Sequence, residues 1–425
     1  LQAYLLNNVR LNNDEDKIAL SLNTSKINKL GPKIKFLGFL NWASSVVSKI
    51  EDYSPKISFL SSFAMSIDYA KNIDNLIPTS ILISLSKLYN EYEENKIKRC
   101  FIKIEDIEKD IKLIKILKNF EKLLDIERDN QIYKIKNHIV NDIFLSLNPK
   151  SITLKSKKLS RVYIEFTDDF VVPILSFFNW NKNYIITFEE PEIVYCNRKL
   201  FKDNRLLGNI DSFLKIFLPF EELKNVTSEK GIFTTSSKKF SNDSIFGFVE
   251  KKFINNYNFF ICDEFGNEWA DHIGLSDESI SFYHSKHGIS KFSASDLQDV
   301  IGQALKNLGN LSPSDDVWTL KESSWTKMYK IKNTLTKISK IRKGTSAREA
   351  IEYFKLLKTF PNLSKKVFLV INFLSKKELE DRLHKLKNGE HFKERNQVIQ
   401  ILWFVSSLIS SCSEANAEIY ICCKP

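Results

Sequence analysis

Three polar side chains lie near one another along the chain in a pattern that suits hydrolytic chemistry: Asp271, His284 and Lys286. They fall within two short apolar runs, residues 269–275 and 280–286, with a polar turn between the runs. This pattern predicts two neighbouring β-strands. Because alternate strand residues point to opposite faces, His284 and Lys286 are expected to share one face of the second strand.

An acidic residue on one strand and a lysine on the next is the layout that metal-dependent phosphodiester cleavage needs. A carboxylate holds a divalent cation, usually Mg²⁺ with several waters. The cation polarises the phosphate and lowers the pKa of its water, while a lysine orients that water or offsets charge on the phosphate. We therefore expect Asp271 to bind Mg²⁺ or Mn²⁺ and Lys286 to position the water. His284 is expected to be a ligand or a hydrogen-bond partner of the scissile phosphate.

The spacing leaves two candidates for a second metal-binding carboxylate. Glu268 has the wrong parity to lie beside Asp271 on a regular strand, but a turn or bulge at the strand start would bring it to the same place. Asp263 follows the apolar run 258–262, which predicts a buried strand. Either Glu268 or Asp263 is expected to complete the coordination.

A helix is expected to follow the two strands. Ser295 and Gln298 form a capping box at its start, and Gln303 lies on its polar face. The apolar residues that recur at helical spacing are Leu297, Val300, Ile301, Ala304, Leu305 and Leu308.

These elements resemble the PD-(D/E)XK nuclease superfamily. The closer resemblance is to nuclease domains joined to, or encoded beside, DEAD/DEAH-type helicases in bacterial defence systems. Those domains carry an E-x-A-D strand, an H-x-K strand and a D-L-x-x-V-x-x-Q-A-x-K helix, which here are residues 268–271, 284–286 and 296–306. The resemblance implies a restriction-endonuclease-like mixed sheet flanked by helices. It also implies that Gln303 helps to hold the site or the substrate.

The function implied by this resemblance is a metal-dependent deoxyribonuclease, expected to be an endonuclease that acts in anti-phage defence with a helicase or ATPase. The chain has His284 where most members of the superfamily have a second carboxylate. The alternative is therefore a catalytically decayed module that binds nucleic acid or a partner protein without cutting. A third alternative is a zinc site built from Cys262, Asp271, His284 and His287, although its spacing matches no zinc motif.

The net charge of +11 favours a polyanionic partner such as DNA, although a lysine-rich composition alone also raises the charge. The segment 318–360 is the most basic and is expected to form two helices. Its candidate nucleic-acid contacts are Lys337, Lys340, Arg342 and Lys343. No Walker A sequence occurs in the chain, so an ATPase would lie on another segment or another protein.

The six cysteines show no CxxC pair, which favours core residues in a reducing cytoplasm over disulfides. No apolar run has transmembrane length, so no membrane is expected. The chain begins with Leu1, which leaves an upstream segment open, and the oligomeric state is also open.

The order of predicted elements indicates an α/β protein with three regions. Residues 1–160 are expected to be a mainly helical accessory domain, and residues 161–240 a strand-rich connection. Residues 241–425 are expected to form the nuclease-like domain. Its other elements are a helix at 244–253, a strand from 365, helices at 377–386 and 395–410, and a closing strand at 418–423.

Overall fold

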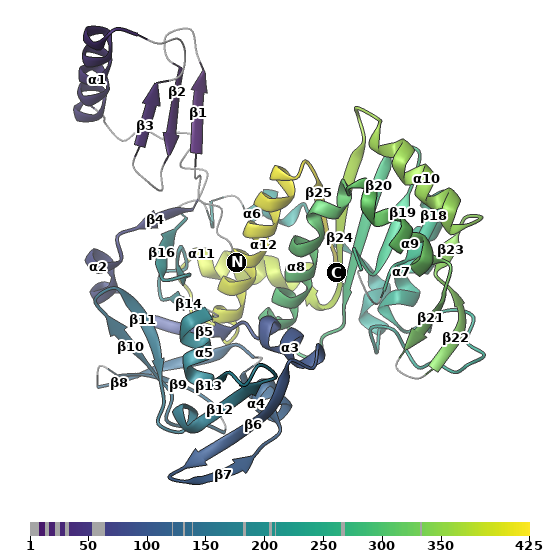
Figure 1. Cartoon of the computed structure of the whole chain (residues 1–425), viewed down its shortest axis with the longest axis horizontal. Coiled ribbons are helices and arrows are strands. Elements are labelled where there is room, and N and C mark those ends of the chain that lie inside the picture. Colours follow the sequence, from purple (N-terminus) through teal and green to yellow (C-terminus); the bar gives the residue numbers. More distant parts are fainter. Residues whose placement is uncertain are drawn as a thin grey trace.

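The structure is a computed structural model, and it shows a mixed α/β protein (Figure 1). It describes residues 8–12, 17–21, 26–29, 34–52, 64–120, 122–130, 132–137, 139–181, 184–203, 206–208, 210–264, 268–331 and 334–425.

A seven-stranded mixed sheet organises the C-terminal part of the chain, in the order β17-β25-β24-β20-β19-β18-β23. Strands β18, β19 and β20 form an antiparallel meander, and β20, β24 and β25 then run parallel. The strands span Phe217–Pro219 (β17), Phe259–Cys262 (β18), His272–Leu275 (β19), Ser279–Lys286 (β20), Ile341–Lys343 (β23), Ser364–Ser375 (β24) and Glu418–Lys424 (β25).

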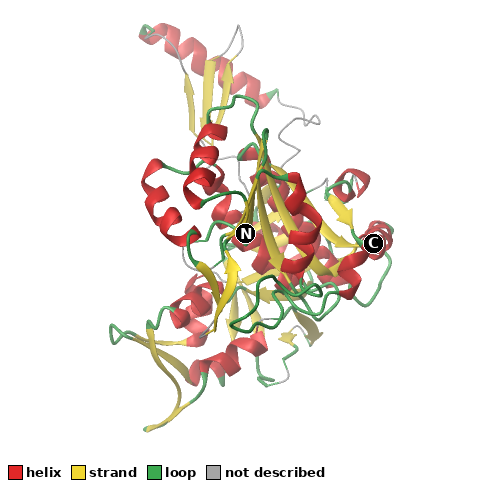
Figure 2. Ribbon diagram, turned by 90° about the vertical axis from the view of Figure 1, so that its right-hand side faces the viewer, coloured by secondary structure: helices red, strands yellow, loops and turns green. Residues whose placement is uncertain are grey.

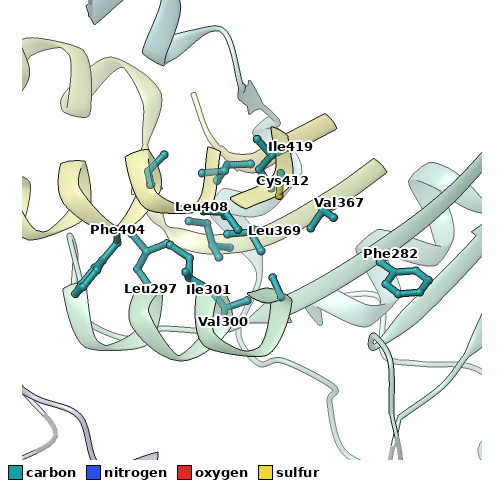
Figure 3. Close-up of a cluster of buried hydrophobic side chains, with 14 of the residues drawn as sticks. Phe282, Leu297, Val300, Ile301, Val367, Leu369, Phe404, Leu408, Cys412 and Ile419 are labelled. Carbon is teal, nitrogen blue, oxygen red and sulfur yellow. The ribbon is translucent and has the colours of Figure 1, made fainter. Parts of the chain in front are cut away.

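Strand β24 lies in the interior of this sheet, between β25 and β20, and its almost continuously apolar sequence suits burial on both faces. Helices α8 (Ala294–Asn307) and α12 (Arg395–Glu414) cover one face, and α7 (Ile245–Phe253) packs on the other. Figure 2 shows helices on both sides of the strands. In Figure 3, apolar side chains of α8 point towards those of β24 and α12.

The register of the meander brings three strand ends together. His272 pairs with Tyr283, and the N–H of Asp263 donates to the carbonyl of Asp271 at 3.0 Å. The end of β18, the start of β19 and the end of β20 therefore meet at one edge of the sheet. Asp271 and Lys286 both lie at this edge.

The preceding part of the chain is built on antiparallel sheets. One has nine strands in the order β11-β10-β9-β8-β5-β14-β15-β16-β4, and another has the order β13-β12-β6-β7. The strands of these two sheets are β4 (Met65–Ile67), β5 (Pro78–Ile83), β6 (Ile97–Ile104), β7 (Ile107–Asp110), β8 (Leu124–Asp129), β9 (Ile132–Ile135), β10 (Phe144–Asn148), β11 (Ser151–Lys155), β12 (Val162–Phe166), β13 (Val171–Pro173), β14 (Tyr184–Phe188), β15 (Ile193–Cys196) and β16 (Lys199–Lys202).

Short helices and a small third sheet complete this part. Helices α2 (Tyr69–Asn72), α3 (Ser86–Glu93), α4 (Leu113–Phe120) and α5 (Ile174–Asn181) lie between the strands. At the N-terminus, β1 (Asn8–Asn12), β2 (Lys17–Ser21) and β3 (Lys26–Lys29) form a three-stranded sheet, followed by α1 (Phe36–Glu51).

The secondary structure of the first 160 residues differs from the expected mainly helical one. Their described part contains more β-strand than helix, and β12 to β16 belong to the same two sheets as the strands before residue 160. The reason lies in the isoleucines of the charged segment 97–110, which forms β6 and β7. β-Branched residues favour strands when neighbouring strands cover them, whatever their helical spacing.

The C-terminal elements largely follow the sequence pattern. The predicted helices appear as α7, α11 (Lys376–Lys387) and α12, and the predicted strands as β24 and β25. Two details are wrong. The cap of α8 is Ser293, whose side chain accepts from the N–H of Asp296 at 3.3 Å, and not Ser295. The basic segment 318–360 contains α9 (Trp318–Trp325), a hairpin of β21 (Met328–Ile331) and β22 (Thr334–Ser339), β23 and α10 (Ala347–Lys358), rather than two helices alone.

All six cysteines are free and buried. Among the described residues, none of the helices combines the length and the apolarity that a membrane crossing requires.

Gly274 tests the packing of the meander. A Cβ atom at this position would lie 2.7 Å from ring atoms of Tyr257, so Gly274→Ala should destabilise the protein by about 1–3 kcal/mol through overpacking. The matched control is Gly302→Ala, because a Cβ atom there would meet nothing within 4 Å on the exposed side of α8. This control should be neutral or stabilising by up to about 1 kcal/mol. Urea unfolding of the two variants checks this, and equal stabilities would contradict the packing.

Candidate active site

Asp271 lies at the sheet edge beside the end of β20. Its Oδ2 accepts a hydrogen bond from the N–H of Ser285 at 2.6 Å, and the residue is buried. Ser285 stands between His284 and Lys286, so the carboxylate of Asp271 is held against the H-x-K segment.

Two further acids and a lysine surround Asp271. Glu264, buried two residues beyond the end of β18, and Glu229, in the loop before α7, both contact the ammonium of Lys230. The distance from Lys230 Nζ to Glu229 Oε1 is 3.3 Å, and Glu264 is the closer partner. Burial alone would lower the pKa of Lys230, but Glu264 and Glu229 outweigh it and raise that pKa above the ordinary lysine value. The ammonium therefore stays charged among the carboxylates.

The pKa of Asp271 is raised well above its ordinary value. Burial is the main cause, and the Glu264 carboxyl, within hydrogen-bonding reach, raises it further. Oε2 of Glu264 is buried and receives no hydrogen bond from any described residue. Two buried carboxyl groups thus lie close together, and the positive charge around them is too small to keep both ionised. This is the electrostatic situation that a bound cation relieves.

Lys286 lies on the side of the site that faces α8. Its Nζ is 3.3 Å from Oδ2 of Asp299, and about a quarter of the side chain (26%) is exposed. Burial alone would lower the pKa of Lys286. The carboxylates of Asp299 and Glu229 outweigh burial and raise that pKa, so the ammonium is charged at neutral pH. Glu229 also acts on Asp271, which joins the two halves of the site electrostatically.

His284 is a neutral imidazole. Burial lowers the pKa of its side chain to about 3, and Nε2 is buried with no hydrogen-bond partner among the described residues. A neutral ring nitrogen can accept a hydrogen bond or ligate a metal ion, although Mg²⁺ prefers oxygen.

Asp263, expected as a second metal ligand, has a structural role instead. Its carboxylate accepts hydrogen bonds from the N–H of Trp269 at 2.8 Å, Trp325 Nε1 at 2.7 Å and Lys321 Nζ at 2.5 Å. Burial raises the pKa of Asp263 and lowers that of Lys321, so desolvation outweighs their attraction. Because both oxygens of Asp263 are engaged, we do not include it among the proposed ligands.

Glu268 and Gln303 also lie away from Asp271 in their contacts. Glu268 lines a cavity together with lysines from α8 and α9. Gln303 is exposed on α8, four residues after Asp299 and on the same stripe of the helix. The structure therefore places Gln303 on a track that leads from Lys286, and not inside the acid cluster.

Of the four predicted nucleic-acid contacts, two are committed to the fold. Arg342 forms a two-pronged ion pair with Glu250 of α7, and Lys343 donates to backbone carbonyl groups at 3.4 Å. Lys337 is exposed on β22, and Lys340 is buried.

The residues of the zinc alternative do not converge. Within the described ranges, no group of three or more His, Cys, Asp and Glu side chains is arranged to hold a metal ion by itself. Cys262 packs among Phe240 and Phe246, and burial raises the pKa of its thiol well above the ordinary value. A protonated thiol in an apolar cluster is a core residue rather than a ligand.

Sequence reasoning missed Glu264, Glu229 and Lys230. Glu264 directly follows Asp263, and only Asp263 was chosen from these two neighbouring acids as a candidate ligand. Glu229 and Lys230 lie in a Ser/Thr/Lys-rich loop before α7, and no periodic pattern connects that loop to β20. The only available signal was the nearness of this loop to the predicted first helix.

A substitution at Asp263 separates a structural role from metal binding. Asp263→Asn leaves the buried Lys321 ammonium without its carboxylate partner, and should reduce the free energy of unfolding by about 3–5 kcal/mol. Urea unfolding measures the loss. The double variant Asp263→Leu, Lys321→Met removes both charges and should recover part of it. Wild-type stability of Asp263→Asn combined with weaker Mn²⁺ binding would show that Asp263 is a ligand after all.

No protein-family model, curated protein or solved structure matches the chain.

Proposed function

We propose that this chain is a metal-dependent nuclease that hydrolyses phosphodiester bonds in DNA. The observation that carries the proposal is a cluster of two buried carboxyl groups, Asp271 and Glu264, and the partly exposed Glu229, beside Lys286 at one sheet edge. A site with perturbed acids next to a charged lysine is a strong candidate for catalysis.

The residues present fit a hard divalent cation. Asp271 and Glu264 supply carboxylate oxygens in contact range of each other, and Mg²⁺ is commonly held by one or two carboxylates with waters in its other positions. The absence of a three-residue group among the described side chains is compatible with such a site. When bound, Mg²⁺ or Mn²⁺ would polarise the phosphate and acidify a bound water.

The other side chains have separate tasks in this proposal. The N–H of Ser285 orients the carboxylate of Asp271. The ammonium of Lys286, charged and partly exposed, holds the attacking water or offsets charge on the phosphate. His284 lies two residues before Lys286 on β20, and its neutral Nε2 is available to accept a hydrogen bond.

The fold that we propose for residues 245–375 is restriction-endonuclease-like. The order α7, β18, β19, β20, α8 supports it, together with the parallel pairing of β20 and β24, whose connection begins with α8 and continues through α9, β21 to β23 and α10. The proposed setting is bacterial anti-phage defence in the cytoplasm, with a helicase or ATPase as partner. Six free thiols fit a reducing compartment, and the net charge of +11 fits a DNA partner.

Binding without cleavage is the second candidate function. The observation that favours it is the ammonium of Lys230, which already neutralises part of the acid cluster. A decayed site could keep its fold in this way without any metal ion.

Cleavage of circular and linear DNA in Mg²⁺ or Mn²⁺ tests the proposal. Asp271→Ala and Lys286→Ala should each slow cutting by about 100-fold or more, because each removes charge stabilisation at the phosphate. Glu264→Gln should have a similar effect if Glu264 is the second ligand. Nicked circles would identify an endonuclease.

The matched controls are Asp277→Ala and Lys291→Ala. Asp277 is exposed on the β19–β20 turn, and Lys291 is exposed and paired with Glu378. Both controls should cut at the wild-type rate. No cutting with either metal, together with DNA binding that survives Asp271→Ala, would leave the binding module as the function.

Lys230 provides a test that does not depend on activity. Lys230→Met leaves the acids without their ammonium, so it should be destabilised by about 3–5 kcal/mol in EDTA. Added Mn²⁺ should then raise its melting temperature more than that of the wild type, because the cation binds only the folded state. Lys252→Met, at a surface pair with Glu222, is the control. A melting temperature that does not respond to Mn²⁺ would contradict metal binding by this cluster.

A further inference from the structure

A strongly basic cavity lies beside Lys340, whose ammonium donates to the carbonyl of Glu264. Its volume is about 730 Å³, and residues of α8, α9, β21 and the segment after β22 line it. Five lysines and one acid are the charged residues of its wall: Lys306, Lys321, Lys327, Lys330, Lys340 and Glu268.

The central residue of this cavity is Lys340, a buried cation without a carboxylate partner among the described residues. Its Nζ donates to the carbonyl of Glu264 at 2.7 Å and to Oγ of Ser324 at 3.2 Å, and only 6% of the residue is exposed. No carboxylate among the described residues lies within ion-pair distance of it. Burying a charge without a counter-ion is costly, so a site of this kind favours a bound anion.

The other lysines add to this excess of positive charge. Lys321 is paired with Asp263, which balances its charge. Lys327 and Lys330 are exposed at the mouth, and neither side chain forms an ion pair or hydrogen bond with a residue in the part of the chain that the structure describes. Glu268 is the one acid in the wall. The wall therefore carries more cations than its acids can balance.

We propose that this lysine pocket binds phosphate groups, either those of a nucleic-acid strand or those of a free nucleotide. Several ammonium groups around one cavity suit an anion with several negative charges and several oxygens. A ligand with a single carboxylate has too few of both. The volume is that of a typical small-molecule site, so it can admit a nucleotide unit and not only one phosphate.

For the strand, the inference rests on the proposed nuclease function, and α8 supplies the path. Asp299, Gln303 and Lys306 lie on one stripe of this helix, the first in contact with Lys286 and the last at the pocket. Seven residues of helix span about 10 Å. A strand cut beside Lys286 would thus pass Gln303 and place a neighbouring phosphate among the lysines.

The pocket and the acid cluster are also joined through the backbone. Lys340 holds the carbonyl of Glu264, whose side chain faces Asp271. An anion that draws the Lys340 ammonium towards the cavity acts on the residue that we propose as a metal ligand.

Binding in EDTA tests the pocket separately from cleavage. The probes are a fluorescent single-stranded oligonucleotide, measured by anisotropy over a salt series, and inorganic triphosphate as competitor. Lys330→Glu is compared with Lys387→Glu, since both lysines are exposed but Lys387 lies on α11 and does not line the cavity. Lys330→Glu should weaken strand binding about tenfold or more, and Lys330→Ala should reduce the salt slope by about 0.7. Lys387→Glu should bind as the wild type does.

Each outcome of these measurements supports or overturns the proposed phosphate-binding pocket. Selective loss of strand binding in Lys330→Glu supports the pocket with a strand as its ligand. Selective loss of triphosphate binding alone supports it with a free nucleotide as its ligand. Equal binding by Lys330→Glu and Lys387→Glu for both ligands overturns it. If the chain does not cut DNA but Lys330→Glu loses binding, the nuclease proposal fails and the pocket stands. If the chain cuts DNA but Lys330→Glu binds both ligands as the wild type does, the nuclease proposal stands and the pocket proposal fails.

Discussion

The buried carboxylate of Asp263 is the constraint on which the candidate site depends. It ties the end of β18 to the N–H of Trp269 and to two side chains of α9, Lys321 and Trp325. Those contacts fix both ends of the connection between β18 and β19. As a result Glu264 and Asp271 meet beside β20, although neither belongs to a regular strand. The site is thus positioned by a residue that we do not expect to take part in its chemistry.

The fold was predictable where one element can be buried in only one way. The apolar run of β24 is too continuous for a half-exposed strand or an amphipathic helix, and the periodicity of α12 is helical throughout. Residues 97–110 were not predictable, because they mix charged residues with isoleucines that suit a helix or a strand equally well. Residues 97–104 form a strand because β6 pairs with β12, which lies far along the chain. The local sequence carries no sign of this pairing.

Part of the candidate site could be inferred from period-two geometry alone. It placed Lys286 at the end of one strand and Asp271 within the neighbouring strand 269–275. In the structure that strand begins at His272, directly after Asp271, and pairs with the strand that ends at Lys286. It could not distinguish Asp263 from Glu264, because a difference of one residue at a strand end reverses the side to which a carboxylate points. Lys230 comes from a loop whose place beside β20 depends on tertiary packing.

The order of strands also governs when the sheet can form. β25 lies between β17 and β24, and Phe217 pairs with Ile421 across almost half of the chain. β17 cannot join the sheet until residues 418–424 have left the ribosome. Contacts of such long range slow folding and leave a strand edge exposed meanwhile. Synthesis of this protein therefore passes through a stage in which β24 has one open edge, and that stage is where a chaperone would be most needed.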